Sequence, residues 1–409
     1  MNRSSILSLL KNRVVLICAL GYFVDVYDLV LFGIVRIASL KGIGIQDSDL
    51  LSSGTLLLNW QMAGLLVGGF AWGVLGDKYG RMRALYGSIL IYSLANLANA
   101  FVTTLPLYAF LRFVAGFGLA GELGAAVTLV SESVPKTARG IGSAIIGLAG
   151  FVGAVCAATL GGLVSWQTSY IIGGVLGLGL LLARVKIGES QMFLTAQKKG
   201  TAAQSSILKI LSSPSTMWKY LRCVFVGVPI WFVSGILMYF SPEFAKELGV
   251  QTSILAGQAI LWNYMGSILG DPLAGLLSQK LQSRKNGLFA FFALGLILIP
   301  SFFFFLRNST AEIFYFTCFL LGIANGYWTL FVTMTAEHFG TNIRATVTTS
   351  VPNVVRATVI PMSVLLLSLK GSIGSLSGAL MIGMGSVILA ILSLISLPET
   401  FSKDLNYVE

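Results

Sequence analysis

Twelve long apolar stretches run through this sequence, and they limit its possible folds more than any other feature. Most approach the length of about 20 residues that a helix needs to cross the hydrocarbon core of a bilayer. Only 11% of the residues are charged, whereas about 25% are charged in a typical soluble domain. The sequence therefore predicts an all-α membrane protein with twelve transmembrane helices. The stretches occupy residues 14–38, 54–75, 84–103, 106–131, 141–164, 168–183, 222–240, 254–278, 287–306, 311–336, 345–368 and 373–397.

The lysines and arginines gather on one side of the predicted membrane. If the N-terminus is cytoplasmic, most of the 27 basic residues, Arg184 among them, fall on the cytoplasmic side, and a few, such as Arg36, fall on the other. This positive-inside distribution predicts that both termini are cytoplasmic, and we expect a multi-pass protein of the bacterial inner (plasma) membrane. It also accounts for the net charge of +11 without a nucleic-acid partner.

The chain divides into two halves. Residues 184–221 form the only long polar segment between apolar stretches, and six stretches lie on each side of it. This organisation predicts an N-terminal six-helix bundle over residues 1–183, a cytoplasmic linker over 184–221 and a C-terminal six-helix bundle over 222–409.

Two short motifs recur in both halves at nearly the same spacing. The loop at 73–83 is matched 202 residues later, and the pair Glu132 and Arg139 recurs 205 residues later. Two related bundles follow from such a repeat. In carriers built this way, the solute path lies at the interface of the repeats, which move against each other.

The loop GVLGDKYGRMR at 73–83 resembles the loop signature of the major facilitator superfamily, and the spaced Glu and Arg pairs resemble its companion signature. The second-half loop carries Gln279 where the signature has an acid. The resemblance covers the whole chain and implies two pseudo-symmetric bundles that work by alternating access. In this family the motifs hold the cytoplasmic side shut in one state, and we expect Arg81 to pair with Glu132. The resemblance therefore implies gating roles for Asp77, Arg81, Glu132, Arg139, Glu337 and Arg344.

The first apolar stretch contains GYFVDVYDLVLFG, which resembles the D-x-[YF]-D motif of proton-coupled metabolite symporters. These include phosphate, aromatic-acid and other organic-ion symporters. Asn353-Val-Val-Arg356, followed by Pro361, resembles the eleventh-helix arginine motif of the same branch. The resemblance favours proton-coupled uptake of a small organic anion.

Six ionisable residues stand inside the apolar stretches. A charge at the centre of a bilayer costs at least about 2.5–3.5 kcal/mol even on the most lenient insertion scale, so such residues are candidates for function. They are Asp25, Asp28, Arg112, Glu122, Asp271 and Arg356.

Asp25 and Asp28 are three residues apart and therefore share one helix face. Two close carboxylates in a poorly solvated cleft resist simultaneous ionisation. We expect at least one of them, with Asp28 the stronger candidate, to take up and release the coupled proton. The alternative is that one aspartate only accepts hydrogen bonds from the backbone or tyrosine hydroxyls. Glu122 is a candidate second protonation site.

The arginines are candidate anion-binding residues. The guanidinium of Arg356 keeps its proton and therefore needs an anion, either a substrate carboxylate or a structural partner such as Asp25, Asp28 or Glu122. Arg112 could line the pathway or hold a neighbouring helix. Asp271 could act in gating or cap a helix. The predicted substrate-binding set is Arg356, Arg112, Tyr27, Asn353, Trp231 and Trp328.

These features predict a secondary transporter, with proton-coupled symport of a small carboxylate as the favoured activity. The alternatives are a carrier of an organic cation, a sugar or another neutral solute, or a proton-driven exporter. A receptor or channel is disfavoured by the repeat. No G-x-x-x-x-G-K-[ST] phosphate loop and no catalytic constellation occurs in the sequence, so we expect no enzyme activity, cofactor or metal. The expected partners are a small-molecule substrate, protons and the lipid bilayer, and we expect a monomer.

Overall fold

The computed structural model describes residues 12–133, 139–184, 213–340 and 343–403. At a few helical positions, among them Asp77, Arg81, Glu132 and Arg139, only the backbone is described. The described residues are almost entirely helical, and every predicted stretch coincides with a helix or a pair of consecutive helices. The prediction of an all-α membrane protein is therefore confirmed.

The first half contains α2 (Arg13–Gly42), η1 (Asp47–Asp49), α3 (Leu50–Tyr79), α4 (Arg81–Asn99), α5 (Leu105–Leu119), α6 (Glu122–Ser133), α7 (Arg139–Leu163) and α8 (Trp166–Arg184). The second half contains α11 (Pro214–Phe232), the π-helical turn η3 (Val233–Leu237), α12 (Ser241–Glu247), α13 (Ala256–Lys280), α14 (Arg284–Phe304), α15 (Ala311–Asn325), α16 (Trp328–Glu337), α17 (Arg344–Ala357), α18 (Val359–Ile373) and α19 (Ser375–Ser396).

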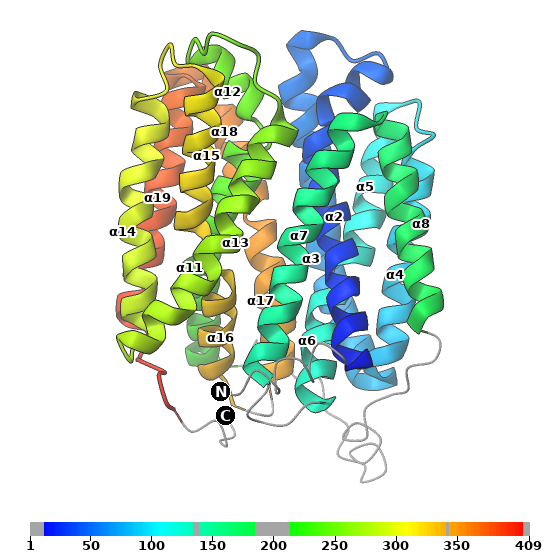
Figure 1. Cartoon of the computed structure of the whole chain (residues 1–409), viewed down its shortest axis with the longest axis vertical. Coiled ribbons are helices and arrows are strands. Elements are labelled where there is room, and N and C mark those ends of the chain that lie inside the picture. The colour runs from blue at the N-terminus through cyan, green and yellow to red at the C-terminus, as the bar shows by residue number, and fades with distance from the viewer. Residues whose placement is uncertain (1–11, 134–138, 185–212, 341–342, 404–409) are drawn as a thin grey trace.

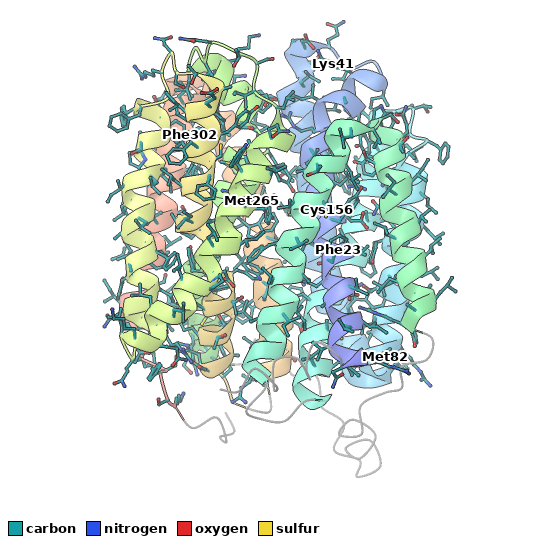
Figure 2. The ribbon with its side chains drawn as sticks, in the orientation of Figure 1. Phe23, Lys41, Met82, Cys156, Met265 and Phe302 are labelled. Atoms are coloured by element: carbon teal, nitrogen blue, oxygen red, sulfur yellow. The ribbon has the colours of Figure 1, made fainter. Side chains whose placement is uncertain are left out.

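Ten helical segments of the described chain are long and apolar enough to cross a membrane. α4 and α13 are not among them, because both carry buried polar side chains such as Asn96 and Asn263. The two halves stand side by side (Figure 1). Large apolar side chains such as those of Met265 and Leu276 are exposed, and many side chains project outward along the sides of both halves (Figure 2), as expected for surfaces that face lipid.

The seventh span begins earlier than predicted. α11 starts at Pro214, inside the segment predicted to be linker, because Ser213 caps the helix and proline suits its first turn. Residues 185–212 lie outside the described chain, so the extent of the linker stays a prediction.

The internal repeat is visible in the helix breaks. The fourth span is interrupted between α5 and α6 at Gly121, and the tenth is interrupted between α15 and α16 at Gly326. These glycines are 205 residues apart, which is the spacing of the repeated Glu and Arg pairs.

The repeat also appears in the packing of backbones. A Cβ on Gly64 of α3 would collide with the carbonyl oxygen of Phe113 in α5. In the second half, 202 residues later, a Cβ on Gly266 of α13 would collide with the carbonyl oxygen of Phe319 in α15. Each half therefore brings one pair of helices into close backbone contact through small residues.

We expect Gly64→Ala to lower the thermal stability of the purified protein, because the added methyl group must push α3 and α5 apart. Overpacking of this kind costs about 1–3 kcal/mol. Gly73→Ala, on the same helix, is the matched control, because its added Cβ meets no atom within 4 Å. Melting followed by differential scanning fluorimetry in detergent tests this, and an equal effect of the two substitutions would contradict the close contact.

Candidate functional site

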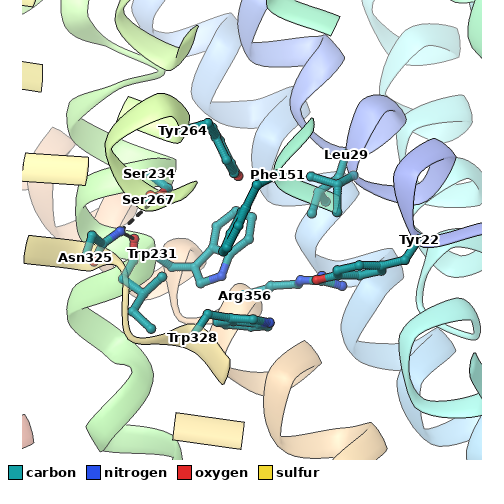
Figure 3. A pocket seen from close by; sticks show the side chains of 12 residues that line it. Tyr22, Leu29, Phe151, Trp231, Ser234, Tyr264, Ser267, Asn325, Trp328 and Arg356 are labelled. Carbon is teal, nitrogen blue, oxygen red and sulfur yellow. Dashed lines mark hydrogen bonds between the residues drawn. The ribbon is translucent and has the colours of Figure 1, made fainter. Parts of the chain in front are cut away.

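A small cavity of about 40 Å³ lies between the two halves (Figure 3). Five of its twelve lining residues are aromatic, and polar groups stand at two opposite sides of the view. α2 contributes Tyr22, Val26 and Leu29, α7 contributes Phe151, and the second half contributes Ile230, Trp231, Ser234, Tyr264, Ser267, Asn325, Trp328 and Arg356. The cavity therefore combines a flat aromatic wall with one cation.

Arg356 is that cation, and it is 2% exposed. Its Nη1 donates to Asn353 Oδ1 at 3.2 Å, and its Nη2 donates to the Tyr22 hydroxyl at 3.4 Å. Its guanidinium carbon lies 5.9 Å from the ring centre of Trp231 and 5.7 Å from that of Trp328. Within the described residues, Nε has no hydrogen-bond partner and no carboxylate forms an ion pair with this side chain. The arginine is buried, charged and open to an anion.

Asn353 positions this arginine and lies behind the cavity wall. Its Nδ2 donates to the carbonyl oxygens of Ala120 and Thr349, at 3.0 and 3.1 Å. The Ala120 carbonyl belongs to the break between α5 and α6, so Asn353 joins the two halves at that break. Both ends of the amide are thus engaged in protein contacts.

Asp25 and Asp28 are completely buried on α2, next to the face that carries Tyr22 and Val26 into the cavity. No carboxylate oxygen of either aspartate has a hydrogen-bond partner among the described residues. Asp25 interacts electrostatically foremost with Arg356.

Asp28 faces Arg112, which lies inside the first half and away from the cavity. Arg112 Nη2 donates to Asn96 Oδ1 at 2.8 Å, and its guanidinium carbon lies 4.8 Å from the ring centre of Tyr170. Tyr27, from the predicted substrate-binding set, also lies away from the cavity, where its hydroxyl donates to the Ser169 carbonyl at 3.4 Å.

Glu122 forms a buried ion pair with Arg184. Arg184 Nη1 donates to Glu122 Oε2 at 3.0 Å, and Nη2 also donates to the Ile17 carbonyl at 3.3 Å. This pairing was not predicted from the sequence, where Arg184 was counted with the cytoplasmic basic residues. Its position as the last residue of α8, directly after an apolar run, was the available signal.

A second ion pair, between the fully buried Arg36 and the partly exposed Glu243, lies at the end of the molecule that carries α12, here called the outer end (Figure 1). Arg36 Nη2 lies 2.6 and 2.7 Å from the two carboxylate oxygens of Glu243 and donates to the Tyr239 carbonyl at 3.2 Å. The Tyr239 hydroxyl donates to the Leu29 carbonyl at 3.1 Å. This contact was not predicted from the sequence, where Arg36 was only counted with the basic residues on the non-cytoplasmic side.

A larger cavity of about 660 Å³ lies between α7 and α13 in the opposite, inner part of the molecule. Phe151 lines both this inner cavity and the central one, and its ring contacts that of Tyr264 at 6.1 Å between centres. Asp271 also lines the inner cavity, where its Oδ1 accepts a hydrogen bond from the Thr329 backbone at 2.8 Å and caps α16. The structure is thus closed at the outer end and hollow toward the inner end.

The repeated motifs meet in the second half. Arg284 lies 2.9 Å from a Glu337 carboxylate oxygen, and the Thr400 hydroxyl donates to the same carboxylate at 2.8 Å. Arg344 Nε donates to the carbonyl oxygens of Ala336 and Phe339, on either side of Glu337 in the chain, at 3.0 Å each. In the first half, the side chains of Asp77, Arg81, Glu132 and Arg139 lie outside the described part, so their pairing stays a prediction.

Glu399 also belongs to this inner end and caps α14. Its carboxylate accepts hydrogen bonds from the Ser283 hydroxyl and from the backbone N–H of Arg284 at 2.9 Å and Lys285 at 3.2 Å. Partial burial acts to raise the pKa of Glu399, but hydrogen bonds from Ser283 and from nearby backbone N–H groups outweigh burial and lower it to about 2. Glu399 therefore supplies a negative group at the second-half loop, where Gln279 occupies the position of the signature's acid.

Known proteins resemble the chain over most of its length. It is 28% identical to the sialic acid transporter NanX of Escherichia coli over 71% of each chain, and 27% identical to the cis,cis-muconate transport protein of Acinetobacter baylyi over 95% of this chain and 93% of that one. It is 31% identical to the 4-hydroxybenzoate transporter PcaK of Pseudomonas putida, over 48% of this chain and 44% of that one.

Solved structures show the same fold. The D-xylose–proton symporter superposes with a TM-score of 0.73 at 15% identity, covering 96% of this chain and 99% of the symporter. The sequence profile of the Major Facilitator Superfamily matches residues 18–355. The two halves, the repeated breaks and this match lead to one conclusion: the chain belongs to the major facilitator superfamily, and it is a multi-pass membrane transporter rather than an enzyme.

Proposed function

We propose that this transporter imports a small organic carboxylate together with protons. The observation that carries the proposal is Arg356, a buried cation that faces the central cavity without an anionic partner among the described residues. A substrate carboxylate can supply that partner through paired, charge-assisted hydrogen bonds. Relatives named as transporters of 4-hydroxybenzoate and muconate support this choice, because both compounds are unsaturated carboxylates.

The cavity wall favours a flat substrate. Trp231, Trp328, Tyr264 and Phe151 offer ring faces and edges to a planar, unsaturated body. At about 40 Å³ the cavity has room for water but not for an aromatic acid, since ligand pockets usually measure about 300–1,000 Å³. Substrate binding therefore requires the two halves to separate, which is the motion that alternating access supplies.

Proton coupling can arise from competition for Arg356. In the empty carrier, Arg356 interacts electrostatically with Asp25. When a substrate carboxylate binds Arg356, it offsets that positive charge, and an ionised buried aspartate becomes more costly. A proton taken up by the α2 aspartates removes that cost. Asp25 and Asp28, which interacts with Arg112, are the first two candidate sites for the coupled proton. Glu122, paired with Arg184, is the third.

The outer and inner ends would then open in turn. The buried contact between Arg36 and Glu243 joins α2 to α12 and must break before substrate can enter from the outer end. Release at the inner end would follow the cavity between α7 and α13, past Phe151. Opening and closing of the inner end would involve the predicted gating residues: Asp77, Arg81, Glu132, Arg139, Asp271, Glu337 and Arg344. The cytoplasmic termini and the bacterial inner membrane are part of the same proposal.

Glu243→Gln should shift the protein toward states that are open at the outer end. Hydrogen bonds to charged groups contribute about 1.5–3 kcal/mol, so losing this pair should raise the open population at least about tenfold. Electron–electron double resonance between labels at Ser48→Cys and Lys246→Cys, with the four native cysteines replaced, reports the distance across the outer end. Asp47→Asn is the control, because it removes the exposed ion pair with Lys41 at the same end. Identical distance distributions in the two variants would contradict the gate.

Asp28→Asn should abolish uptake driven by a pH gradient, because the side chain can no longer release a proton. Exchange of substrate across proteoliposomes should persist in part, since exchange needs no net proton movement. Both are measured with radiolabelled 4-hydroxybenzoate, and Asp49→Asn, an exposed acid before α3, serves as control. Undiminished accumulation against a gradient would refute the coupling role.

Arg356→Lys should weaken binding of 4-hydroxybenzoate at least tenfold, because an ammonium group cannot reproduce the paired hydrogen bonds of a guanidinium. Isothermal titration calorimetry on purified protein measures this, with the exposed Arg307→Lys as control. Equal affinity of wild type and variant would instead assign Arg356 to a structural pair with the acids of the first half.

A further inference from the structure

The polar groups opposite Arg356 in the central cavity are not needed to bind a carboxylate. Asn325, Ser234 and Ser267 stand together on one side of the cavity, whereas Arg356 and Tyr22 stand on the other (Figure 3). They come from α15, η3 and α13, three separate segments of the second half. Their convergence on one side of a largely apolar wall calls for a chemical reason.

The hydrogen bonds of Asn325 leave its oxygen available. Its Nδ2 donates to the Ile230 carbonyl at 2.9 Å and to Ser234 Oγ at 3.1 Å. These two bonds use both amide hydrogens and fix the orientation of the side chain. Within the described residues no donor reaches Oδ1, and the side chain, which lines this cavity and a smaller neighbouring one, keeps 6% exposure. An unsatisfied acceptor therefore stands on the cavity wall.

Ser234 supplies the complementary donor. Its Oγ accepts from Asn325, so its hydroxyl hydrogen is free to point elsewhere, and no described acceptor takes it. Ser267 differs, because its hydroxyl already donates to the carbonyl oxygens of Asn263 and Gly322, at 3.1 and 3.2 Å. The cavity end thus presents one acceptor and one donor side by side.

The backbone around Ser234 is unusual in the same place. Ser234 lies in the single π-helical turn η3, directly after α11, which contains Pro229. π turns are rare, and they occur frequently at functional sites. The tenth span also breaks directly after Asn325. Both Ser234 and Asn325 therefore lie where the helical backbone is irregular.

We infer that Asn325 and Ser234 form a specificity subsite for a hydroxyl group on the substrate, at the end remote from its carboxylate. A hydroxyl donates one hydrogen bond and accepts others, so it satisfies Asn325 Oδ1 and the Ser234 hydroxyl together. When an acid without that hydroxyl binds, both groups stay buried without a hydrogen-bond partner, and the cost of this lowers the affinity for that acid. This inference rests on the proposed carboxylate function and adds the substrate class, a flat hydroxylated acid.

The test compares acids with and without the hydroxyl on scaffolds of two lengths. The probes are benzoate with its 3- and 4-hydroxy derivatives, and 3-phenylpropionate with its 3- and 4-hydroxyphenyl derivatives, titrated into the purified full chain by calorimetry. In wild type, at least one hydroxylated acid should bind about tenfold more tightly than its parent. Ser234→Ala should reduce that preference to less than about threefold, and measurable binding of the parent acid shows that the variant is folded.

The control is Ser386→Ala on α19, a buried serine that bonds only its own helix at Gly383 and should keep the full preference. Equal binding of hydroxylated and parent acids by wild type, or an undiminished preference in Ser234→Ala, would overturn the subsite and leave the carboxylate function standing. If no acid binds wild type, or if Arg356→Lys changes none of the affinities, the proposed function fails and the subsite fails with it.

Discussion

A charge buried away from water must be neutralised by a partner or by a change in its own protonation, and this constraint sorts the ionisable residues of the transporter. Two pairs satisfy each other directly: Arg184 with Glu122 inside the first half, and Arg36 with Glu243 at the outer end. Asp25, Asp28 and Arg356 are equally buried but lack such partners among the described residues. Arg356 lines the central cavity and Asp25 lies on α2 next to the face that lines it, whereas Asp28 lies deeper in the first half, so a substrate and a proton can complete these groups.

The two halves contribute different functional residues, although their folds repeat one another. The acids lie on α2 of the first half, whereas the cation, the two tryptophans and the polar end of the cavity belong to the second half. Tyr22 and Asn353 connect the two halves at Arg356. Tyr22 of the first half accepts a hydrogen bond from Arg356. Asn353 of the second half accepts another from Arg356 and donates to the Ala120 carbonyl, at the helix break of the first half. Movement of one half against the other therefore changes the surroundings of the aspartates and of the arginine at the same time.

Rigid pairs of helices make such a movement possible. Gly64 and Gly266 hold α3 against α5 and α13 against α15 through backbone contact, so each pair can move as a unit. The contacts between halves are different in kind. At the outer end they are a salt bridge and hydrogen bonds, and at α7 and α13 they are aromatic edges such as Phe151 on Tyr264. Contacts of this type can break and re-form without disturbing the helix pairs.

Sequence alone determined the membrane class, the helical segments and the repeat, because hydrocarbon demands long apolar helices and a duplicated motif keeps its spacing. It also singled out Arg356, Trp231 and Trp328, which the structure places on the cavity wall, since a charge or a large ring inside a span is conspicuous in one dimension. Tertiary structure decided which residues meet. It placed Arg112 and Tyr27 inside the first half, paired Arg36 with Glu243 across 207 residues, and brought Ser234 and Asn325 to one cavity wall. Such pairings depend on how helices pack and where they break, and no local pattern along the chain encodes the distance between two side chains from different spans.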